Sequence, residues 1–340
     1  MMSTVETEVL VAGAGLSGLM AANALRQHNL EVTLLDKGRS VGGRLATRRI
    51  GAGRADHGAQ FFTVRSHKFQ AFVNRWLAED LVYEWSTGWN DGLNSQTFSD
   101  GHPRYAVRGG MNRLAKHLAA DLDVKLKVRL IAVSPTVEGW QAEDEQGQRY
   151  QSRALLLTPP VPQSLQLLTA GQTSLTSQDE TILKKIEYAP CLAGLFVVEG
   201  VNFLPEPGAV QLADASINWI ANNQRKGISP EATVITVHAG PEYSRHHWET
   251  AETQVLADLE AGLRRYLSQS TKIIEAQYKR WRYALPTSLY AGPCLLAKDL
   301  PPLVFAGDAF GGPRIEGAAL SGLAAAQTLV ETMVETLSEE

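Results

Sequence analysis

The stretch VLVAGAGLSGLMAANAL, residues 9–25, decides the fold of this chain. Glu8 to Val11 have the composition of a short apolar strand, and Leu19 to Leu25 have that of a helix. A glycine-rich turn separates the two segments. This order predicts the first β-strand and α-helix of a parallel α/β domain, with the turn between them facing a ligand.

Three glycines in the turn have separate expected roles. At GxGxxG spacing, Gly13 permits the tight turn, Gly15 lets backbone approach a pyrophosphate, and Gly18 lets the helix pack on the strand. A second strand, Glu31 to Leu35, ends at Asp36, about 20 residues on, where a carboxylate can bind ribose hydroxyls. We therefore predict a dinucleotide site. The alternative, a turn without a ligand, leaves Asp36 unexplained, and at this point both NAD and FAD remain open.

The composition is that of an ordinary globular protein. The chain has 340 residues, of which 44% are hydrophobic and 20% charged, and a formal net charge of -4. Lys and Arg are scattered, so neither nucleic acid nor a membrane surface is an expected partner. No stretch reaches the roughly 18 apolar residues of a membrane span, and no signal peptide is expected. The two cysteines, Cys191 and Cys294, form no CxxC pair, which favours a reduced, cytoplasmic chain without a metal site.

The segment after Asp36 favours FAD. LLDKGRSVGGR, residues 34–44, resembles the second FAD motif of the flavin amine oxidase superfamily. The resemblance implies that Gly42, Gly43 and Arg44 lie along the pyrophosphate and flavin, where glycines allow close approach and a guanidinium offers fixed donors. The alternative is a solvated basic loop.

Three further segments resemble members of the renalase family within this superfamily. They are ADHGAQFFT (residues 55–63), SINWIANNQRKG (216–227) and KRWRYALP (279–286). The first is expected to return under the flavin. Trp219 and Trp281 could shape a planar aromatic pocket, and packing at a domain junction is the alternative for Trp281.

The middle of the chain carries weaker signals. RYAVRGGMNRLAKHL, residues 104–118, resembles a helix start of the same superfamily. VKLKVRLIAV, residues 124–133, alternates and predicts one strand, in which the resemblance implies that Leu130 meets the adenine.

The segment FAGDAFGGPRIEGAALSG, residues 305–322, repeats the order of strand, glycine turn and small-residue helix. The resemblance implies that Asp308 binds the pyrophosphate or ribityl chain and that the helix N-terminus points at the pyrimidine edge of the flavin, where its dipole stabilises negative charge. The residues expected at FAD are Gly13, Gly15, Leu16, Ser17, Gly18, Asp36, Lys37, Gly43, Arg44, Gly58, Ala59, Gln60, Phe61, Leu130, Trp281, Gly307, Asp308, Glu316, Gly317 and Ala318.

The expected fold is α/β: a discontinuous, doubly wound Rossmann-type FAD-binding domain with an inserted α+β substrate domain, as in amine oxidases and renalases. Residues 1–65, 103–160 and 280–340 are assigned to the FAD-binding domain, and 66–102 and 161–279 to the substrate domain. FAD is expected to be non-covalent, since no cysteine lies in a flavin-attaching motif. The lysine that many amine oxidases place near the flavin is absent from YAPCLAGLFVVEG, residues 188–200, and the aromatic motif of monoamine oxidases is also absent.

The resemblance implies an FAD-dependent oxidase. Its expected substrate is a dihydropyridine dinucleotide, the 2- or 6-dihydro form of NAD(P), which is oxidised to NAD(P)+ by hydride transfer while O2 becomes H2O2. Trp219, Asn223, Arg314 and Glu316 are expected to orient the substrate. An amine oxidase or polyene desaturase is one alternative, and a non-catalytic FAD-binding protein is another. The protein is expected to be a monomer or a weak homo-oligomer.

Overall fold

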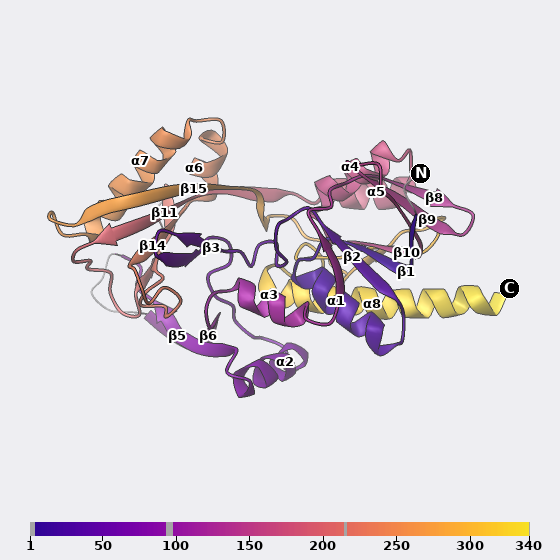
Figure 1. Cartoon of the computed structure of the whole chain (residues 1–340), viewed down its shortest axis with the longest axis horizontal. Coiled ribbons are helices and arrows are strands. Elements are labelled where there is room, and N and C mark those ends of the chain that lie inside the picture. Colours follow the sequence, from indigo (N-terminus) through magenta and orange to yellow (C-terminus); the bar gives the residue numbers. More distant parts are fainter. Residues whose placement is uncertain (1–3, 93–97, 214–215, 340) are drawn as a thin grey trace. The chain divides into compact units, whose positions relative to one another are not determined.

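The computed structural model describes residues 4–92, 98–213 and 216–339 (Figure 1). Contacts divide the chain into two compact units, each assembled from separate segments. Unit 1 consists of residues 1–43, 115–187 and 286–340, and unit 2 of residues 44–114 and 188–285. The helix α3 (Asn112–Leu118) crosses one of these boundaries.

Unit 1 is built around a parallel sheet. In its described part the strand order is β16-β17-β10-β1-β2-β7, and every neighbouring pair from β17 to β7 is parallel. The chain leaves β1 toward β2 on one side and returns through β10 on the other, which is the doubly wound arrangement predicted from residues 9–25. The elements of unit 1 are β1 (Val5–Ala12), α1 (Leu16–Gln27), β2 (Val32–Asp36), β7 (Asp123–Leu126), β8 (Leu130–Thr136), β9 (Gly139–Asp144), β10 (Arg149–Leu157), α4 (Val161–Ala170), α5 (Ser177–Lys184), β16 (Leu295–Leu296), β17 (Leu303–Phe305) and α8 (Arg314–Glu339).

The central strands of this sheet are apolar on both faces. Val9, Leu10 and Val11 of β1 are fully buried, as are Leu155 and Leu156 of β10. Continuous apolar runs of this kind are typical of parallel strands covered on both sides. Figure 1 shows α8, drawn in yellow, running beside α1, and the two helices pack together in unit 1.

The strand predicted over residues 124–133 is wrong: the chain forms two strands there. β7 pairs with β2, whereas β8 pairs antiparallel with β9. Between them the backbone of Lys127 has φ 60°, and the N–H groups of Lys127 and Val128 donate to the carbonyls of Gly38 and Asp36. The alternating pattern is the same in both strands, so it did not reveal the turn.

Unit 2 contains a five-stranded sheet in the order β12-β13-β14-β11-β15, in which the neighbours from β12 to β11 are antiparallel, together with two strand pairs, β3-β4 and β5-β6. α7 packs on β11 and β14, and its Val255, Leu259 and Leu263 join the core of this unit. The elements of unit 2 are β3 (Thr47–Ile50), β4 (Gly53–Asp56), α2 (His67–Ala78), β5 (Val82–Trp89), β6 (Phe98–Val107), β11 (Tyr188–Glu199), β12 (Ala209–Gln211), β13 (Ile217–Asn222), β14 (Val234–Ala239), α6 (Pro241–His246), α7 (Glu252–Leu263), the 3-10 helix η1 (Arg264–Tyr266) and β15 (Lys272–Pro286).

The compact units and the predicted domains divide the chain differently. Residues 44–65 and 103–114, predicted for the FAD-binding domain, make their contacts in unit 2, and residues 161–187, predicted for the substrate domain, make theirs in unit 1. Contacts within the chain show which segments form a compact unit. They do not show which unit binds FAD and which binds substrate. The assignment of segments to FAD and to substrate therefore remains a prediction.

None of the helices in the described ranges combines the length and the apolar character that a membrane crossing requires.

Candidate functional site

The loop between β1 and α1 uses its glycines for different reasons. Gly13 has φ 95°, and a Cβ atom there would lie 2.6 Å from Oγ1 of Thr158. A Cβ on Gly18 would lie 2.1 Å from the carbonyl oxygen of Gly13. Both positions therefore need glycine for the protein's own packing.

At Gly15, by contrast, packing within the protein does not require a glycine. Its φ is -77°, which any residue adopts, and no protein atom lies within 4 Å of where its Cβ would be. It caps α1 without a side-chain hydrogen bond, so the N-cap residue satisfies none of the first N–H groups of the helix through a side chain. The Oγ of Ser17 in the first turn is buried and has no partner among the described residues. Such a helix N-terminus fits a phosphate group.

Asp36 holds the glycine loop from the end of β2. Its Oδ2 accepts from the N–H of Ala14 at 2.8 Å, and its Oδ1 accepts from the N–H of Gly38 at 2.6 Å. A carboxylate has about four lone-pair sites, so capacity remains for ribose hydroxyls. Gly43 lies in the same loop cluster, since a Cβ there would be 3.6 Å from Cα of Gly15.

Lys37 and Leu130 lie at the margin of this cluster. Nζ of Lys37 donates to Oε1 of Gln163 in α4 at 3.2 Å, and burial, followed by the charge of Arg129, lowers the Lys37 pKa. Leu130 is half-buried at the start of β8, two residues after Val128, which binds the Asp36 carbonyl.

The motif after β17 meets the N-terminal loop at Thr158, a residue that sequence reasoning did not single out. Oγ1 of Thr158 donates to the carbonyl of Ala12 at 2.7 Å, and the protein atom nearest to a Cβ on Gly307 would be the Thr158 carbonyl oxygen at 3.9 Å. The N–H of Gly307 donates to Oγ of Ser321 in α8 at 2.9 Å. Asp308 is buried. Unit 1 therefore brings the two predicted FAD motifs together at the carboxyl ends of β1, β10 and β17.

The start of α8 carries four of the predicted site residues. Gly317, expected at FAD, is required by the chain itself, because a Cβ there would lie 1.8 Å from the Gly312 carbonyl oxygen. Ala318 and Glu316 are half-buried in the first turns, and Arg314 is exposed with φ 79°. A positive φ is uncommon for an arginine, and such conformations cluster at functional sites.

In unit 2, the segment from Arg44 to Phe61 folds around backbone contacts. A Cβ on Gly58 would lie 2.0 Å from the Arg44 carbonyl oxygen, which also accepts from the N–H of Ala59 at 2.9 Å. Nη1 of Arg44 donates to the carbonyl of Ala284 at 3.3 Å. Gly58 is therefore fixed by close packing, which also orients the residues that follow it.

A buried ion pair that sequence reasoning missed lies beneath this segment. Nζ of Lys226 donates to Oδ2 of Asp56 at 2.6 Å, and both side chains are completely buried. Oδ1 of Asp56 accepts from Oγ1 of Thr47 and from the N–H of Met111, at 2.5 and 2.9 Å. Lys226 was not singled out from the sequence. Its partner is 170 residues away, so no local pattern could reveal it.

Asn223 serves this network and does not face a substrate. It is 0% exposed; its Oδ1 accepts from the N–H of Asp56 at 3.1 Å, and its Nδ2 donates to Val234 and Thr236. The expectation that Asn223 orients the substrate therefore needs correction: with donors and acceptor engaged inside the protein, this side chain positions Asp56.

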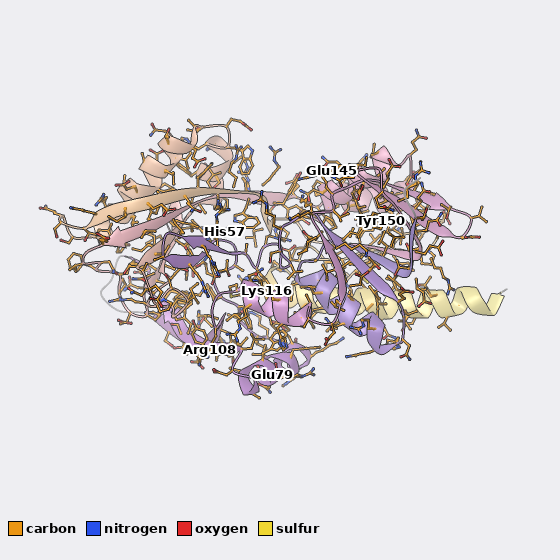
Figure 2. The ribbon with its side chains drawn as sticks, viewed as in Figure 1. His57, Glu79, Arg108, Lys116, Glu145 and Tyr150 are labelled. Carbon is orange, nitrogen blue, oxygen red and sulfur yellow. The ribbon has the colours of Figure 1, made fainter. Side chains whose placement is uncertain are left out.

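His57, labelled in Figure 2, stacks on Trp281. The ring centroids are 5.3 Å apart, and Nε1 of Trp281 donates to the carbonyl of His57 at 2.8 Å. Burial, then the charges of Lys279, His238 and Arg48, lower the His57 pKa to about 3. Burial also lowers the pKa of His238 to about 4. Both rings are therefore neutral near pH 7.

Trp219 belongs to a group of four aromatic side chains, Phe61, Trp85, Trp89 and Trp219, which we call the aromatic group. Phe61 lies 4.9 Å from Trp89 and 5.4 Å from Trp219 between ring centroids, and the two indoles meet edge to face at 5.0 Å. Phe61 and Trp85 are half-buried. Trp85 and Trp89 lie on one strand, β5, whose pairing with β6 is irregular between them, so alternation along the strand did not reveal that their rings meet.

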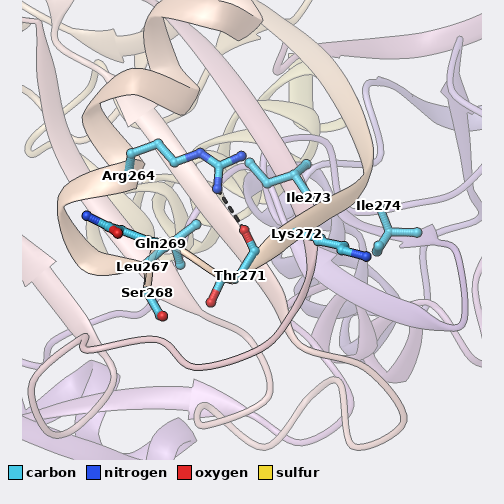
Figure 3. Close-up of a pocket in the computed structure, with 8 residues that line it drawn as sticks. All are labelled: Arg264, Leu267, Ser268, Gln269, Thr271, Lys272, Ile273 and Ile274. Atoms are coloured by element: carbon cyan, nitrogen blue, oxygen red, sulfur yellow. Dashed lines mark hydrogen bonds between the residues drawn. The ribbon is translucent and has the colours of Figure 1, made fainter.

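A hollow of about 680 Å³ lies elsewhere in unit 2, beside η1 and the start of β15 (Figure 3). Arg264, Thr271 and Lys272 line it, and Nη1 of Arg264 donates to the Thr271 carbonyl at 2.8 Å. It contains none of the predicted site residues. Within the described ranges, no three His, Cys, Asp or Glu side chains gather closely enough to hold a metal ion.

Two family models match this chain. Residues 11–76 match the model of an NAD(P)-binding Rossmann-like domain, and residues 82–330 match that of flavin containing amine oxidoreductase. Mouse (Mus musculus) renalase is 25% identical over 341 residues, covering 95% of this chain and 98% of the relative.

Solved structures with the same fold include a variant of putrescine oxidase, with a TM-score of 0.72 and 15% identity. Another is a putative protoporphyrinogen oxidase from Exiguobacterium, with a TM-score of 0.70 and 16% identity. In both comparisons 97% of this chain and 100% of the other are covered. These likenesses establish the fold over nearly the whole chain.

Proposed function

The chain belongs to the flavin containing amine oxidoreductase family, and we propose that within this family it is a renalase-like oxidase of isomeric dihydro-NAD(P). Membership makes it an FAD-dependent oxidoreductase that acts on a small molecule. The proposed substrate is the 2- or 6-dihydro form of the nicotinamide ring. FAD, when bound, would supply the two-electron acceptor for a hydride lost by this ring, which would leave as NAD(P)+; O2 would then take the two electrons, the proton of the hydride and one proton from water to become H2O2.

The aromatic group is the observation that carries this proposal. Phe61 and Trp85 are half-buried and pack against the buried rings of Trp89 and Trp219, so the group combines flat apolar surface with ring edges close together. Such surfaces suit a planar ring by stacking and by edge-to-face contact. Hydride loss makes the dihydropyridine aromatic without removal of a further proton, so a neutral His57 in the same unit is no obstacle.

Charge favours a dinucleotide over an amine. Arg48 and Lys279 are close enough to His57 for their charges to lower its pKa. Positive charge attracts the phosphates of a dinucleotide and repels a protonated amine. An amine substrate remains the second candidate, because aromatic faces also attract cations. Polyene desaturation and non-catalytic FAD binding have no comparable observation in their favour.

Two further parts of the proposal rest on the sequence. FAD is held without a covalent bond, and the protein acts in the cytoplasm as a monomer or weak homo-oligomer. The open helix N-terminus at Gly15, with the unpartnered Oγ of Ser17, supports binding of the phosphates.

Anaerobic stopped-flow absorbance tests the function. Holoprotein is mixed with borohydride-generated NADH isomers, with purified 4-dihydro-NADH, and with a panel of amines. We expect rapid bleaching of the flavin by the 2- or 6-isomers alone and, on admission of O2, one H2O2 for each NAD+ formed. If amines alone bleached the flavin, the protein would be an amine oxidase and the proposal would be wrong. If none of these compounds bleached it, the protein would be a non-catalytic flavoprotein.

A further inference from the structure

The aromatic group has two half-buried rings, Phe61 and Trp85, and two buried rings, Trp89 and Trp219, each of which is 6% exposed. Most of the surface that a ligand could contact therefore belongs to Phe61 and Trp85. Stacking and edge-to-face contacts depend on how the rings are oriented. The contacts that fix these two rings consequently decide whether the group can receive a planar ligand.

One buried ammonium group contacts Trp85 and the chain next to Phe61. Nζ of Lys226 lies over the ring of Trp85, 5.0 Å from its centroid. It also donates to the carbonyl of Gln60, which belongs to the peptide group that joins Gln60 to Phe61. Its third neighbour is Oδ2 of Asp56 at 2.6 Å. The Lys226 side chain is 0% exposed, so these three neighbours hold its charge inside unit 2.

The main chain of Lys226 is tied to the same strand as Trp85. The hydroxyl of Tyr83, two residues before Trp85 on β5, donates to the Lys226 carbonyl. Burial, then the charge of Asp56, raises the Tyr83 pKa above its usual range, so this hydroxyl keeps its proton. Nε1 of Trp85 donates to the carbonyl of Pro207 at 3.3 Å. The indole is therefore held at its face by a cation and at its edge by a carbonyl.

Stability alone does not account for a buried pair of Asp56 and Lys226. Burial removes the hydration of both charges, and their attraction often only balances that cost. Apolar side chains of similar size would fill the same space without it. A cation over an aromatic face, in contrast, is a directional contact that favours one placement of the ring.

We propose that Lys226, held in place by Asp56, is the positioning residue of the aromatic group and sets the orientation of Phe61 and Trp85 toward substrate. The inference rests on the proposed function, in which this group receives the dihydropyridine ring. Lys226 acts through the Trp85 face and through the peptide group before Phe61. Because its side chain has no exposed surface, it does not itself touch the substrate.

Circular dichroism of the holoprotein tests the positioning directly. Indole rings in close contact give an exciton signal in the far ultraviolet that depends on the angle between them, and the rings of Trp85 and Trp89 lie 4.7 Å apart at 63°. The double variant D56N/K226M removes both charges together and keeps every tryptophan. We expect it to lose as much of this signal as Trp85→Leu does, although Trp85 is still present.

The same double variant tests the consequence for substrate. In anaerobic stopped-flow with the 2- or 6-dihydro isomers of NADH, the concentration that gives half of the maximal bleaching rate should rise about three- to tenfold, the contribution expected of well-placed aromatic contacts. The maximal rate should change less than this, because neither Lys226 nor Asp56 has exposed surface with which to touch the reacting ring.

Ser244→Ala is the matched control in the same unit. It removes a buried 3.0 Å hydrogen bond from the N–H of Leu192 and should keep both the exciton signal and the half-saturating concentration. If D56N/K226M does not accumulate as folded protein, Lys226→Gln replaces it. An amide can still donate to Asp56 but carries no charge, so the same losses are expected.

A wild-type exciton signal in the folded pair variant would overturn the positioning role, as would an equal loss of signal in Ser244→Ala. A lost signal with an unchanged half-saturating concentration would overturn the link between these rings and substrate. The dichroism needs no substrate. If the dihydropyridine isomers failed to bleach the wild-type flavin, the proposed function would be wrong, and the dichroism would still decide whether Lys226 orients the rings.

Discussion

At the scale of single residues, Gly15 and Gly18 show how one motif combines two requirements. A Cβ at Gly18 would strike the Gly13 carbonyl, whereas a Cβ at Gly15 would meet no protein atom. Gly15→Ala is therefore expected to leave the free energy of unfolding of the apoprotein within about 0.5 kcal/mol of wild type and to weaken FAD binding at least about tenfold, because the methyl group would occupy space kept for phosphate. Chemical denaturation and flavin fluorescence titration measure the two quantities.

Gly18→Ala is the matched variant. Its Cβ would lie 2.1 Å from a backbone oxygen, so it should destabilise the apoprotein itself. If Gly15→Ala destabilised the apoprotein as much as Gly18→Ala does, the space at Gly15 would not be reserved for a ligand.

His57 and His238 predict a pH dependence of stability. Burial lowers their pKa values to about 3 and about 4, below the ordinary 6.5. The unfolded chain therefore binds protons first as pH falls, so their contribution is complete above pH 6.5 and is lost progressively from there down to about pH 4 for His238 and about pH 3 for His57. Each histidine should contribute a slope approaching about 1.4 kcal/mol per pH unit within that window.

Urea unfolding of the apoprotein at several pH values between 7.5 and about 5 measures this slope. His57→Gln should reduce it, and the H57Q/H238Q double variant should reduce it further. A slope unchanged in the double variant would show that other groups cause the loss of stability in acid.

The residues whose role could be predicted from the sequence are those whose role is set by their neighbours along the chain. The glycines and Asp36 belong to one βα unit, so spacing alone indicated their task. Asn223, Lys226 and Asp56 form a network whose members meet across two segments. Hydrogen bonds between distant segments leave no periodicity, and Asn223 was consequently taken for a residue that contacts substrate.

At the scale of elements, α1 and α8 depend on a glycine at their contact. A Cβ at Gly322 would lie 2.2 Å from the carbonyl oxygen of Ser17. Within a helix, alanine is ordinarily up to about 1 kcal/mol better than glycine. Here the clash should outweigh that gain, and we expect Gly322→Ala to lower the free energy of unfolding by about 1–3 kcal/mol.

Urea unfolding of apoprotein tests this, with Gln327→Ala on the exposed side of α8 as the control. The control should stay within about 0.5 kcal/mol of wild type. A stabilised Gly322→Ala variant would mean that α8 shifts away from α1 at little cost.

Helices and strands could be predicted from the sequence where the pattern of residue types changes at their ends. The apolar runs of β1 and β10 and the small residues of α8 were recognisable in this way. β7 and β8 were not separated, because the turn at Lys127 uses neither glycine nor proline and is held by carbonyls of the distant residues Gly38 and Asp36.

At the scale of the whole molecule, the proposed non-covalent attachment of FAD agrees with the chemistry of the two cysteines. Burial raises the pKa of Cys191 to about 12, and burial also raises the pKa of Cys294, whose Sγ lies 3.5 Å from Oγ1 of Thr328. Since the thiolate is the nucleophile, neither cysteine is suited to attack a flavin. Precipitation of holoprotein with trichloroacetic acid should leave essentially all of the yellow flavin in the supernatant. Flavin retained in the pellet, with a matching mass increase of the protein, would contradict non-covalent binding.

The family and the doubly wound fold could be predicted from local motifs. The compact units could not, because they are set by which segments pack together. Residues 44–65 carry FAD motifs by sequence and yet make their contacts in unit 2. Local motifs report what a segment binds, whereas core packing decides the body to which it belongs.

The contact between α1 and α8 also constrains how the protein is made. α1 leaves the ribosome early, but the helix that covers it, and β17 beside β10, are translated only after both segments of unit 2. α1 must therefore remain incompletely covered through most of synthesis, and the doubly wound core closes after translation has passed residue 322. Contacts so distant in sequence also close slowly. A nascent chain stalled before α8 should consequently be a client for chaperones and not yet a flavoprotein.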